Sequence, residues 1–82
     1  MNNKVDILVG EVFKKRRMKM GLTQAQMGKL IGMPQSTLAC YENGLRGLNL
    51  DTFFDLCNAY GLRPNEVQRE VKKKLDTSED DS

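Results

Sequence analysis

Side chains suited to covalent or metal chemistry are few in this sequence. It contains no histidine and two cysteines, Cys40 and Cys57, which are not spaced as a CxxC or CxxxC pair. Without such a pair or an imidazole, the chain has neither the ligand set of a metal site nor a base that would activate a thiol. We therefore expect no cofactor, no metal and no enzymatic activity, and we expect both cysteines to be reduced.

Ionic side chains offer a different chemistry, the binding of a polyanion. The 82 residues include 13 Lys and Arg against 11 Asp and Glu, a net charge of +2. Four of the acids, Asp76, Glu79, Asp80 and Asp81, lie in the last seven residues, which leaves 7 acids against 13 basic residues, or +6, over residues 1–75. This balance suits a polyanionic partner such as nucleic acid.

The length and hydropathy of the chain limit the class of protein. A chain of this size has room for one domain with a modest core. No apolar run approaches the ~18 residues that span a membrane, and residues 1–9 are too polar for a secretory signal. We expect a cytoplasmic protein with one domain over residues 1–75 and an acidic, disordered tail over residues 76–82.

Four glycines divide the chain into short segments with helical periodicity. Gly21, Gly32, Gly44 and Gly61 each follow such a segment, and glycine readily takes the left-handed conformation that ends a helix. The pattern predicts an all-α fold. Its five helices are expected near residues 6–20, 23–31, 34–43, 50–60 and 64–75.

Local signals mark three of the helix starts. Thr23 and Gln26 have the spacing of a capping box. Pro34 suits a first helical turn, and Asn49 is a good N-cap. The apolar residues expected to face the core are Leu8, Val9, Val12, Phe13 and Met20 in the first helix, Met27, Leu30 and Ile31 in the second, Leu38 and Tyr41 in the third, and Leu50, Phe53, Phe54, Leu56, Cys57 and Tyr60 in the fourth.

From residue 17, the string RMKMGLTQAQMGKLIGMPQSTLACYENG resembles the lambda-repressor-like, or Xre/Cro-like, helix-turn-helix family. The shared features are an arginine four residues before Gly21, the string GLTQ, Gly32 in the turn, QST with an apolar residue at 35–38, and an aromatic residue with Glu42 before Gly44. The string LNLDTFFDLCNAYGLRPNEV resembles the fourth helix and the start of the fifth, so the resemblance covers about residues 9–67. It implies a compact bundle of about five helices that binds double-stranded DNA.

The resemblance also implies two packing features. Gly28 stands where the family has a small residue. Because a mid-helix glycine costs ~1 kcal/mol relative to alanine, we expect the third helix to pack tightly on it. Arg17 and Glu42 resemble the family's arginine and glutamate that join the first helix to the end of the third as a shielded ion pair. The alternative is two solvated surface charges, which contribute almost nothing to stability.

By resemblance, the third helix enters the major groove, where base edges present distinguishable donor and acceptor patterns. Gln35 matches a base-contacting position, and its amide can bond N6 and N7 of adenine. Ala39 and Cys40 stand where relatives often carry longer polar or basic side chains, so we expect few direct contacts with base edges there. The expected base-reading residues are Gln35, Ser36, Thr37 and Cys40.

Phosphate contacts are expected on both sides of this helix. They should add affinity and salt dependence without adding sequence choice. For Arg16, which stands where an apolar residue is common, the alternative is a solvated side chain. The expected contacts are Thr23 and Gln24 at the start of the second helix, Asn43 and Arg46 beside Gly44, and Arg16.

One short recognition helix reads only a few base pairs. We therefore expect a homodimer that joins two half-sites ~34 Å apart. Its surface is either the apolar stripe Val67, Val71 and Leu75 or the ends of the fourth and fifth helices. The alternative is that the stripe packs back on the first helix and the protein is monomeric.

These inferences predict a transcriptional regulator, a repressor of a phage, plasmid, mobile-element or other bacterial promoter, that binds a twofold-symmetric operator as a dimer. The rival hypothesis is an antitoxin or adaptor module that acts through a protein partner such as a toxin or polymerase. The lack of long side chains at Ala39 and Cys40 and the acidic tail motivate that rival.

Overall fold

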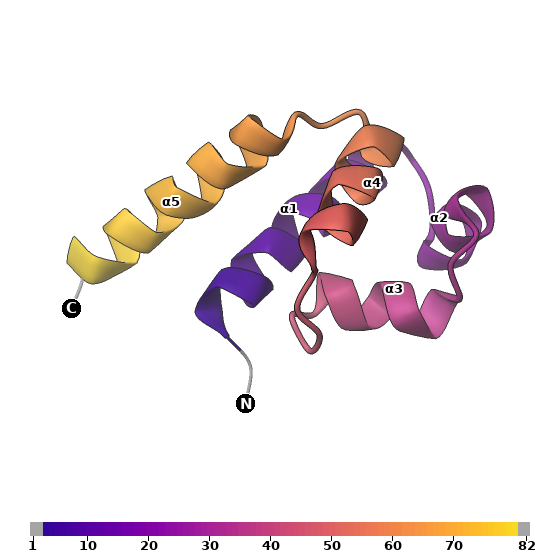
Figure 1. Ribbon diagram of the computed structural model, residues 1–82, viewed down its shortest axis with the longest axis horizontal. Helices are drawn as coiled ribbons and strands as arrows, with labels where there is room; N and C mark the ends of the chain where they lie inside the picture. The colour runs from indigo at the N-terminus through magenta and orange to yellow at the C-terminus, as the bar shows by residue number, and fades with distance from the viewer. Residues whose placement is uncertain (1–2, 81–82) are drawn as a thin grey trace.

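The computed structural model describes the backbone of residues 3–80 and the side chains of residues 3–76. Within this range α1 and α5 lie side by side, α2 and α3 lie on the other side of α1, and α4 crosses in front of α1 (Figure 1). The predicted all-α fold is confirmed. The helices are α1 (Lys4–Lys19), α2 (Gln24–Ile31), α3 (Gln35–Glu42), α4 (Leu50–Tyr60) and α5 (Pro64–Asp80).

Side-chain caps begin three of these helices. The Asn3 side chain accepts a hydrogen bond from the amide of Val5, and α1 therefore starts two residues before the predicted Asp6. The capping box of α2 is confirmed, because the Thr23 amide donates to Gln26 Oε1 (2.8 Å) and the Gln26 amide donates to Thr23 Oγ1 (3.1 Å). The predicted cap of α4 is also confirmed, since Asn49 accepts from the Thr52 amide at 2.8 Å.

The fifth helix is longer than expected. The sequence predicts an end near Leu75 followed by a disordered tail, whereas α5 continues through Asp80. Residues 76–80 contain neither glycine nor proline, so no residue there interrupts the helical hydrogen bonds. The last two residues of the expected tail lie outside the described residues.

The core lies where α1, α4 and α5 meet. Phe13 of α1 packs edge-on against Tyr60 (ring centroids 5.1 Å apart) and against Phe53 (6.1 Å). Cys57 is buried beside them, as predicted, and burial raises the pKa of its thiol. A buried, protonated thiol is a poor nucleophile. None of the helices in the described chain is both long and apolar enough to span a membrane.

Several apolar residues expected in the core are exposed. Leu30 and Leu50 are each 71% exposed and Phe54 is 50% exposed. On α4 the inward row is formed by Phe53, Leu56, Cys57 and Tyr60, so Leu50 and Phe54 form a separate row one turn apart. On α2, Met27 is fully buried and Ile31 is half-buried. Met20, the first residue after α1, is also exposed.

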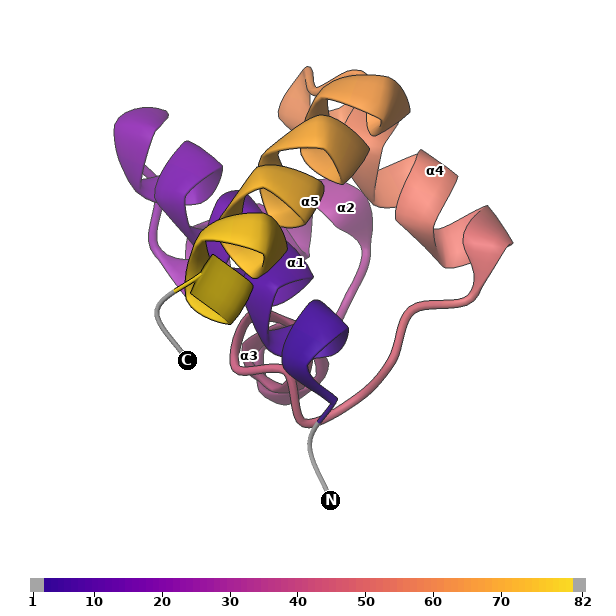
Figure 2. The same ribbon diagram turned by 90° about the vertical axis from the view of Figure 1, so that its left-hand side faces the viewer.

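The expected dimer stripe is used inside the subunit. Val67 and Val71 are buried and Leu75 is partly buried, because α5 packs along α1 (Figure 2). This is the alternative in which the stripe packs back on the first helix. Val67 and Val71 therefore offer little exposed surface, and their role in a surface between two copies stays a prediction.

Two helical glycines mark close approaches between segments. A Cβ on Gly28 would lie 2.5 Å from the carbonyl oxygen of Met33. The tight contact that the sequence predicts at Gly28 is therefore made mainly by the turn before α3. A Cβ on Gly10 would overlap the carbonyl oxygens of Tyr41 and Glu42 at the end of α3. Sequence analysis missed this second approach, although a glycine inside a helical pattern was a signal for it.

Candidate nucleic-acid interface

The turn between α2 and α3 is set by its local sequence. Gly32 ends α2 in the left-handed conformation (φ 70°), which glycine adopts without a side-chain clash. Pro34 then occupies the N-cap of α3, where its missing amide hydrogen costs nothing. The chain turns between these residues, and α3 starts at Gln35 with its first turn facing away from the core.

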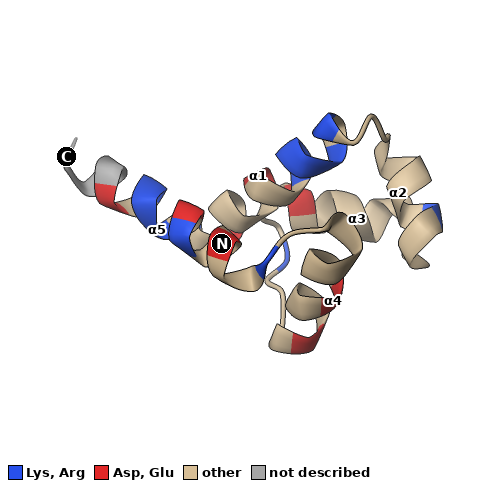
Figure 3. Ribbon diagram, turned by 90° about the horizontal axis from the view of Figure 1, so that it is seen from above, with Lys and Arg blue, Asp and Glu red and all other residues tan. Residues whose placement is uncertain are grey.

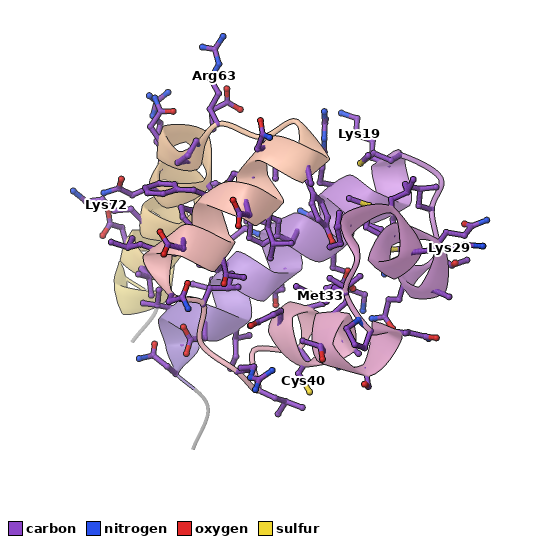
Figure 4. All side chains as sticks on the ribbon, turned by 45° about the vertical axis from the view of Figure 1, so that its right-hand side comes forward. Lys19, Lys29, Met33, Cys40, Arg63 and Lys72 are labelled. Carbon is purple, nitrogen blue, oxygen red and sulfur yellow. The ribbon has the colours of Figure 1, made fainter. Side chains whose placement is uncertain are left out.

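The outer face of α3 is polar at its N-terminal end. Gln35 and Ser36 are exposed, and Thr37 is half-buried. Farther along, Cys40 is half-buried with a free thiol, and its sulfur points away from the molecule (Figure 4). The first turn thus presents an amide and hydroxyl groups, which can both donate and accept hydrogen bonds, whereas the second turn presents mainly small groups.

A buried ion pair attaches the far end of α3 to α1. Arg17 Nε donates to Glu42 Oε2 (2.7 Å), and Arg17 Nη2 donates to Glu42 Oε1 (3.0 Å). The two side chains are 9% and 0% exposed. The hydrogen bonds to Glu42 raise the pKa of Arg17. This two-point geometry restricts both position and orientation, so it determines how α3 sits on α1.

The same carboxylate also holds the start of α2. Gln24 Nε2 donates to Glu42 Oε1 at 3.1 Å, and Arg17 Nη1 donates to the carbonyl of Leu22 at 2.6 Å. Sequence analysis expected Gln24 at a phosphate and did not foresee its bond to Glu42. The sequence gives no signal for a pair 18 residues apart. The network therefore joins α1, the start of α2 and the end of α3.

The loop after α3 carries the remaining expected contacts. Asn43 is the exposed C-cap of α3. Arg46 is exposed, and its guanidinium lies over the ring of Tyr41, 5.8 Å from the centroid. This cation–π contact restricts the arginine side chain while its hydrogen-bond donors stay accessible. Thr23, Gln24, Asn43 and Arg46 thus lie at the two ends of the α2–α3 unit.

Arg16 does not belong to this surface. Its Nε donates to the carbonyl oxygen of Tyr60 at 2.9 Å, at the C-terminal end of α4, where basic side chains commonly satisfy free carbonyls. That end of α4 lies on the opposite side of the molecule from α3 (Figure 1). We therefore withdraw Arg16 from the expected phosphate contacts, and neither of the two expected roles describes it.

Charge is distributed unevenly around this unit. α3 contains no Lys or Arg, and its single acid, Glu42, is buried. Figure 3 shows a concentration of basic residues on the C-terminal part of α1. The residues that carry it are Lys14, Lys15, Arg16, Arg17 and Lys19. The outer face of α3 is therefore uncharged, and Arg46 is an exposed basic residue in the loop that follows it.

No group of three or more His, Cys, Asp or Glu within the described residues is arranged to hold an ion. The amide, hydroxyl and guanidinium groups at the candidate site can form hydrogen bonds.

The fold is shared with solved structures of regulators. The clp gene regulator ClgR from Corynebacterium glutamicum superposes with a TM-score of 0.80 at 18% identity, over 94% of this chain and 84% of that chain. The restriction-modification controller protein C.AhdI from Aeromonas hydrophila gives a TM-score of 0.67 at 26% identity, over 74% of this chain and 92% of that chain. A comparison with curated proteins gave no match.

A family model described as helix-turn-helix matches residues 13–67, more than half of the 82 residues. The matched region includes α2, the turn and α3, together with the Arg17–Glu42 pair and all of α4. The resemblance seen in the sequence is thereby confirmed. The chain belongs to the Xre/Cro-like helix-turn-helix family of DNA-binding transcriptional regulators, which are not enzymes.

Proposed function

We propose that this protein is a repressor that binds a twofold-symmetric DNA operator as a homodimer. The observation that carries the proposal is the exposed polar first turn of α3, on a helix whose other end is attached to α1 by a buried ion pair. A reading helix must be held rigidly, because base recognition depends on the placement of individual hydrogen bonds. A regulator of this kind acts where the DNA is, in the bacterial cytoplasm.

Base reading is assigned to the outer face of α3. Gln35 is exposed in the first turn, where its amide can bind adenine in one orientation: its nitrogen donates to adenine N7 and its oxygen accepts from the N6 amino group. Ser36 and Thr37 follow with hydroxyl groups that suit bases or phosphates. Cys40, one turn later, offers a small apolar contact for a thymine methyl group. Specificity therefore concentrates near Gln35.

Phosphate contacts are assigned to the two ends of the α2–α3 unit. At the start of α2, the capping box engages the Thr23 and Gln26 amides and leaves those of Gln24 and Ala25 at the positive end of the helix dipole. At the other end, Asn43 and Arg46 provide an amide and a guanidinium. A phosphate at each end would orient α3 in the major groove.

The dimer follows from the size of the reading surface. A helix of eight residues reads only a few base pairs, and two such helices one DNA turn apart multiply the discrimination. Repression then requires only that the occupied operator overlap the promoter, because the bound protein and polymerase compete for the same DNA.

Selection of binding sequences from random duplex DNA tests this proposal. We expect enrichment of a site with twofold symmetry and half-sites about 10 base pairs apart, centre to centre. The protein is also isolated from its host cells to test whether a partner protein copurifies with it. If no sequence is enriched and a stoichiometric partner copurifies, the proposal is refuted and the antitoxin or adaptor hypothesis is favoured.

A further inference from the structure

A small cavity lies between the N-terminal half of α1, the end of α3 with its following loop, and α4. It has a volume of about 130 Å³, close to the ~150 Å³ of a cavity that holds one benzene molecule. Val9, Leu48 and Phe53 form an apolar wall. Asp6 and Arg46 also line the cavity, so one small space presents a carboxylate and a guanidinium beside apolar side chains.

The Asp6 carboxylate stays accessible because residue 47 has no side chain. A Cβ on Gly47 would lie 3.2 Å from Asp6 Oδ2, so a larger residue there would crowd the carboxylate. The φ of Gly47 is not positive, and its backbone therefore does not require glycine. Asp6 is half-buried and forms no ion pair with another described residue. A carboxylate in such a place favours a cation that can donate hydrogen bonds.

Arg46 supplies the opposite charge. Its guanidinium lies over the ring of Tyr41, 5.8 Å from the centroid, and Tyr41 also lines the cavity. A guanidinium stacked on an aromatic ring keeps its N–H donors available at its edge. No carboxylate of a described residue forms an ion pair with it. Arg46 can therefore bind a carboxylate through two parallel hydrogen bonds.

We propose that this cavity binds a small α-amino acid with an aliphatic side chain. The ammonium group of the ligand donates to Asp6, its carboxylate accepts from Arg46, and its side chain lies against Val9 and Phe53. Ligand sites commonly combine an apolar wall with a few polar groups that fix the orientation of the ligand. A molecule with only one of the two charges would satisfy only one end of this cavity.

The cavity shares Arg46 with the proposed DNA contact. The same guanidinium donors cannot bind the carboxylate of an amino acid and a DNA phosphate at the same time. The amino acid should therefore weaken DNA binding, and DNA should weaken the binding of the amino acid by the same factor. This regulatory step rests on the proposed function, whereas binding of the amino acid to the free protein does not.

The binding step is tested on the free protein without DNA. The protein is titrated with glycine, L-alanine, L-valine and L-leucine, and amide chemical shifts are followed by NMR. We expect saturable shifts at the residues that line the cavity. Isobutylamine and isovalerate are the matched probes, because they equal L-valine without its carboxylate and without its amine. Each should bind at least about tenfold more weakly than L-valine, since each loses charge-assisted hydrogen bonds.

Two variants test the position of the site. Asp6→Asn should lower the affinity for L-valine at least about tenfold. Asp51→Asn is the matched control, because Asp51 also lies in the first turn of a helix but does not line the cavity. Gly47→Ala keeps both charges and should still weaken binding, because its Cβ crowds the Asp6 carboxylate. The amide spectrum of each variant without ligand shows whether it is folded.

Three outcomes of these titrations overturn the proposal: no saturable shifts with any of the four amino acids, equal affinity for L-valine and its two single-charge analogues, or equal losses with Asp6→Asn and Asp51→Asn.

The regulatory step is measured on random duplex DNA. Saturating L-valine should lower the DNA affinity of the native protein about threefold to fivefold, the loss expected for one phosphate contact, and should leave that of Asp6→Asn unchanged. If L-valine binds but DNA affinity does not change, the shared use of Arg46 is wrong. If L-valine binds but the protein binds no DNA, the proposed function fails while the amino-acid site stands.

Discussion

The α2–α3 side of the molecule and the α4–α5 side are attached to α1 by different kinds of contact. On the first side, directed hydrogen bonds from Arg17 and Gln24 converge on the buried carboxylate of Glu42. On the second side, Phe13 and Tyr60 pack edge-on and Val67 and Val71 cover α1. Directed bonds specify orientation, which base reading needs, whereas apolar packing is less directional and leaves an open groove beside α5.

Glu42→Ala gives the largest expected effect on the polar side. It leaves the Arg17 guanidinium buried without its carboxylate, which should lower the free energy of unfolding by about 3–5 kcal/mol. Urea unfolding measures this. Glu66→Ala is the control, because the Arg63–Glu66 pair is largely exposed with its charged atoms 3.7 Å apart, and it should change little. Equal losses in the free energy of unfolding for the two variants would contradict the role of the buried Glu42 carboxylate in attaching α3 to α1.

A double variant sharpens the comparison. Arg17→Met with Glu42→Leu replaces the ion pair by apolar side chains, and such replacements often recover the stability that a single variant loses. We expect the double variant to be more stable than Glu42→Ala but to discriminate less between a selected operator and random DNA. Recovery of both properties would show that the directed bonds are not needed for orientation.

Stability at high pH tests the environment of Tyr60, which packs against Phe13 of α1. Burial, with a smaller contribution from Glu42, raises the pKa of Tyr60 from 10 to about 12. Between pH 10 and 12 the unfolded tyrosine loses its proton first, so the free energy of unfolding should fall by roughly 2–3 kcal/mol as the pH rises through that interval.

Tyr60→Phe removes this part of the pH dependence, and lysine titration cancels when the variant and native curves are subtracted. The Tyr60 hydroxyl has no hydrogen-bond partner among the described residues, so its loss should cost little near pH 7. Tyr41→Phe keeps Tyr60 and should keep the fall. If the free energy of unfolding of the native protein ran parallel to that of Tyr60→Phe from pH 10 to 12, Tyr60 would not be the source of the fall.

The smallest expected effect lies at the edge of the reading face. Arg46→Ala should weaken the binding of cognate and random DNA alike, by about 1 kcal/mol or less. It should also reduce the slope of log affinity against log salt concentration by the amount expected for about one phosphate contact. Fluorescence anisotropy at several salt concentrations measures both. A loss confined to the cognate sequence would instead make Arg46 a base-reading residue.

Local signals in the sequence predicted the elements on both sides. Thr23, Asn49 and Gly61 begin or end helices through bonds within a few residues, and those signals are present in the string itself. The family resemblance paired Arg17 with Glu42. Neither source placed Arg16, because its acceptor, the carbonyl of Tyr60, lies 44 residues away.

The exposed apolar residues show a second limit of prediction from the sequence. Helical periodicity identifies which residues are apolar on one side of a helix, but it does not say which of them another helix covers. The stripe of Val67 and Val71 suited either α1 or a second subunit, and only the packed fold shows that both side chains are buried within the subunit. Leu50 and Phe54 were expected inside for the same reason, although they lie outside the inward row of α4.

The reading of bases by α3 is tested most directly at single DNA atoms. In a selected operator, each adenine is replaced in turn by 7-deazaadenine, which lacks the N7 acceptor. We predict that the native protein loses about tenfold in affinity at one adenine of each half-site. Gln35→Ala should lose nothing further there. Equal losses for both proteins at that adenine, or no loss at any adenine, would contradict the assignment of Gln35 and with it the account of α3 as the reading helix.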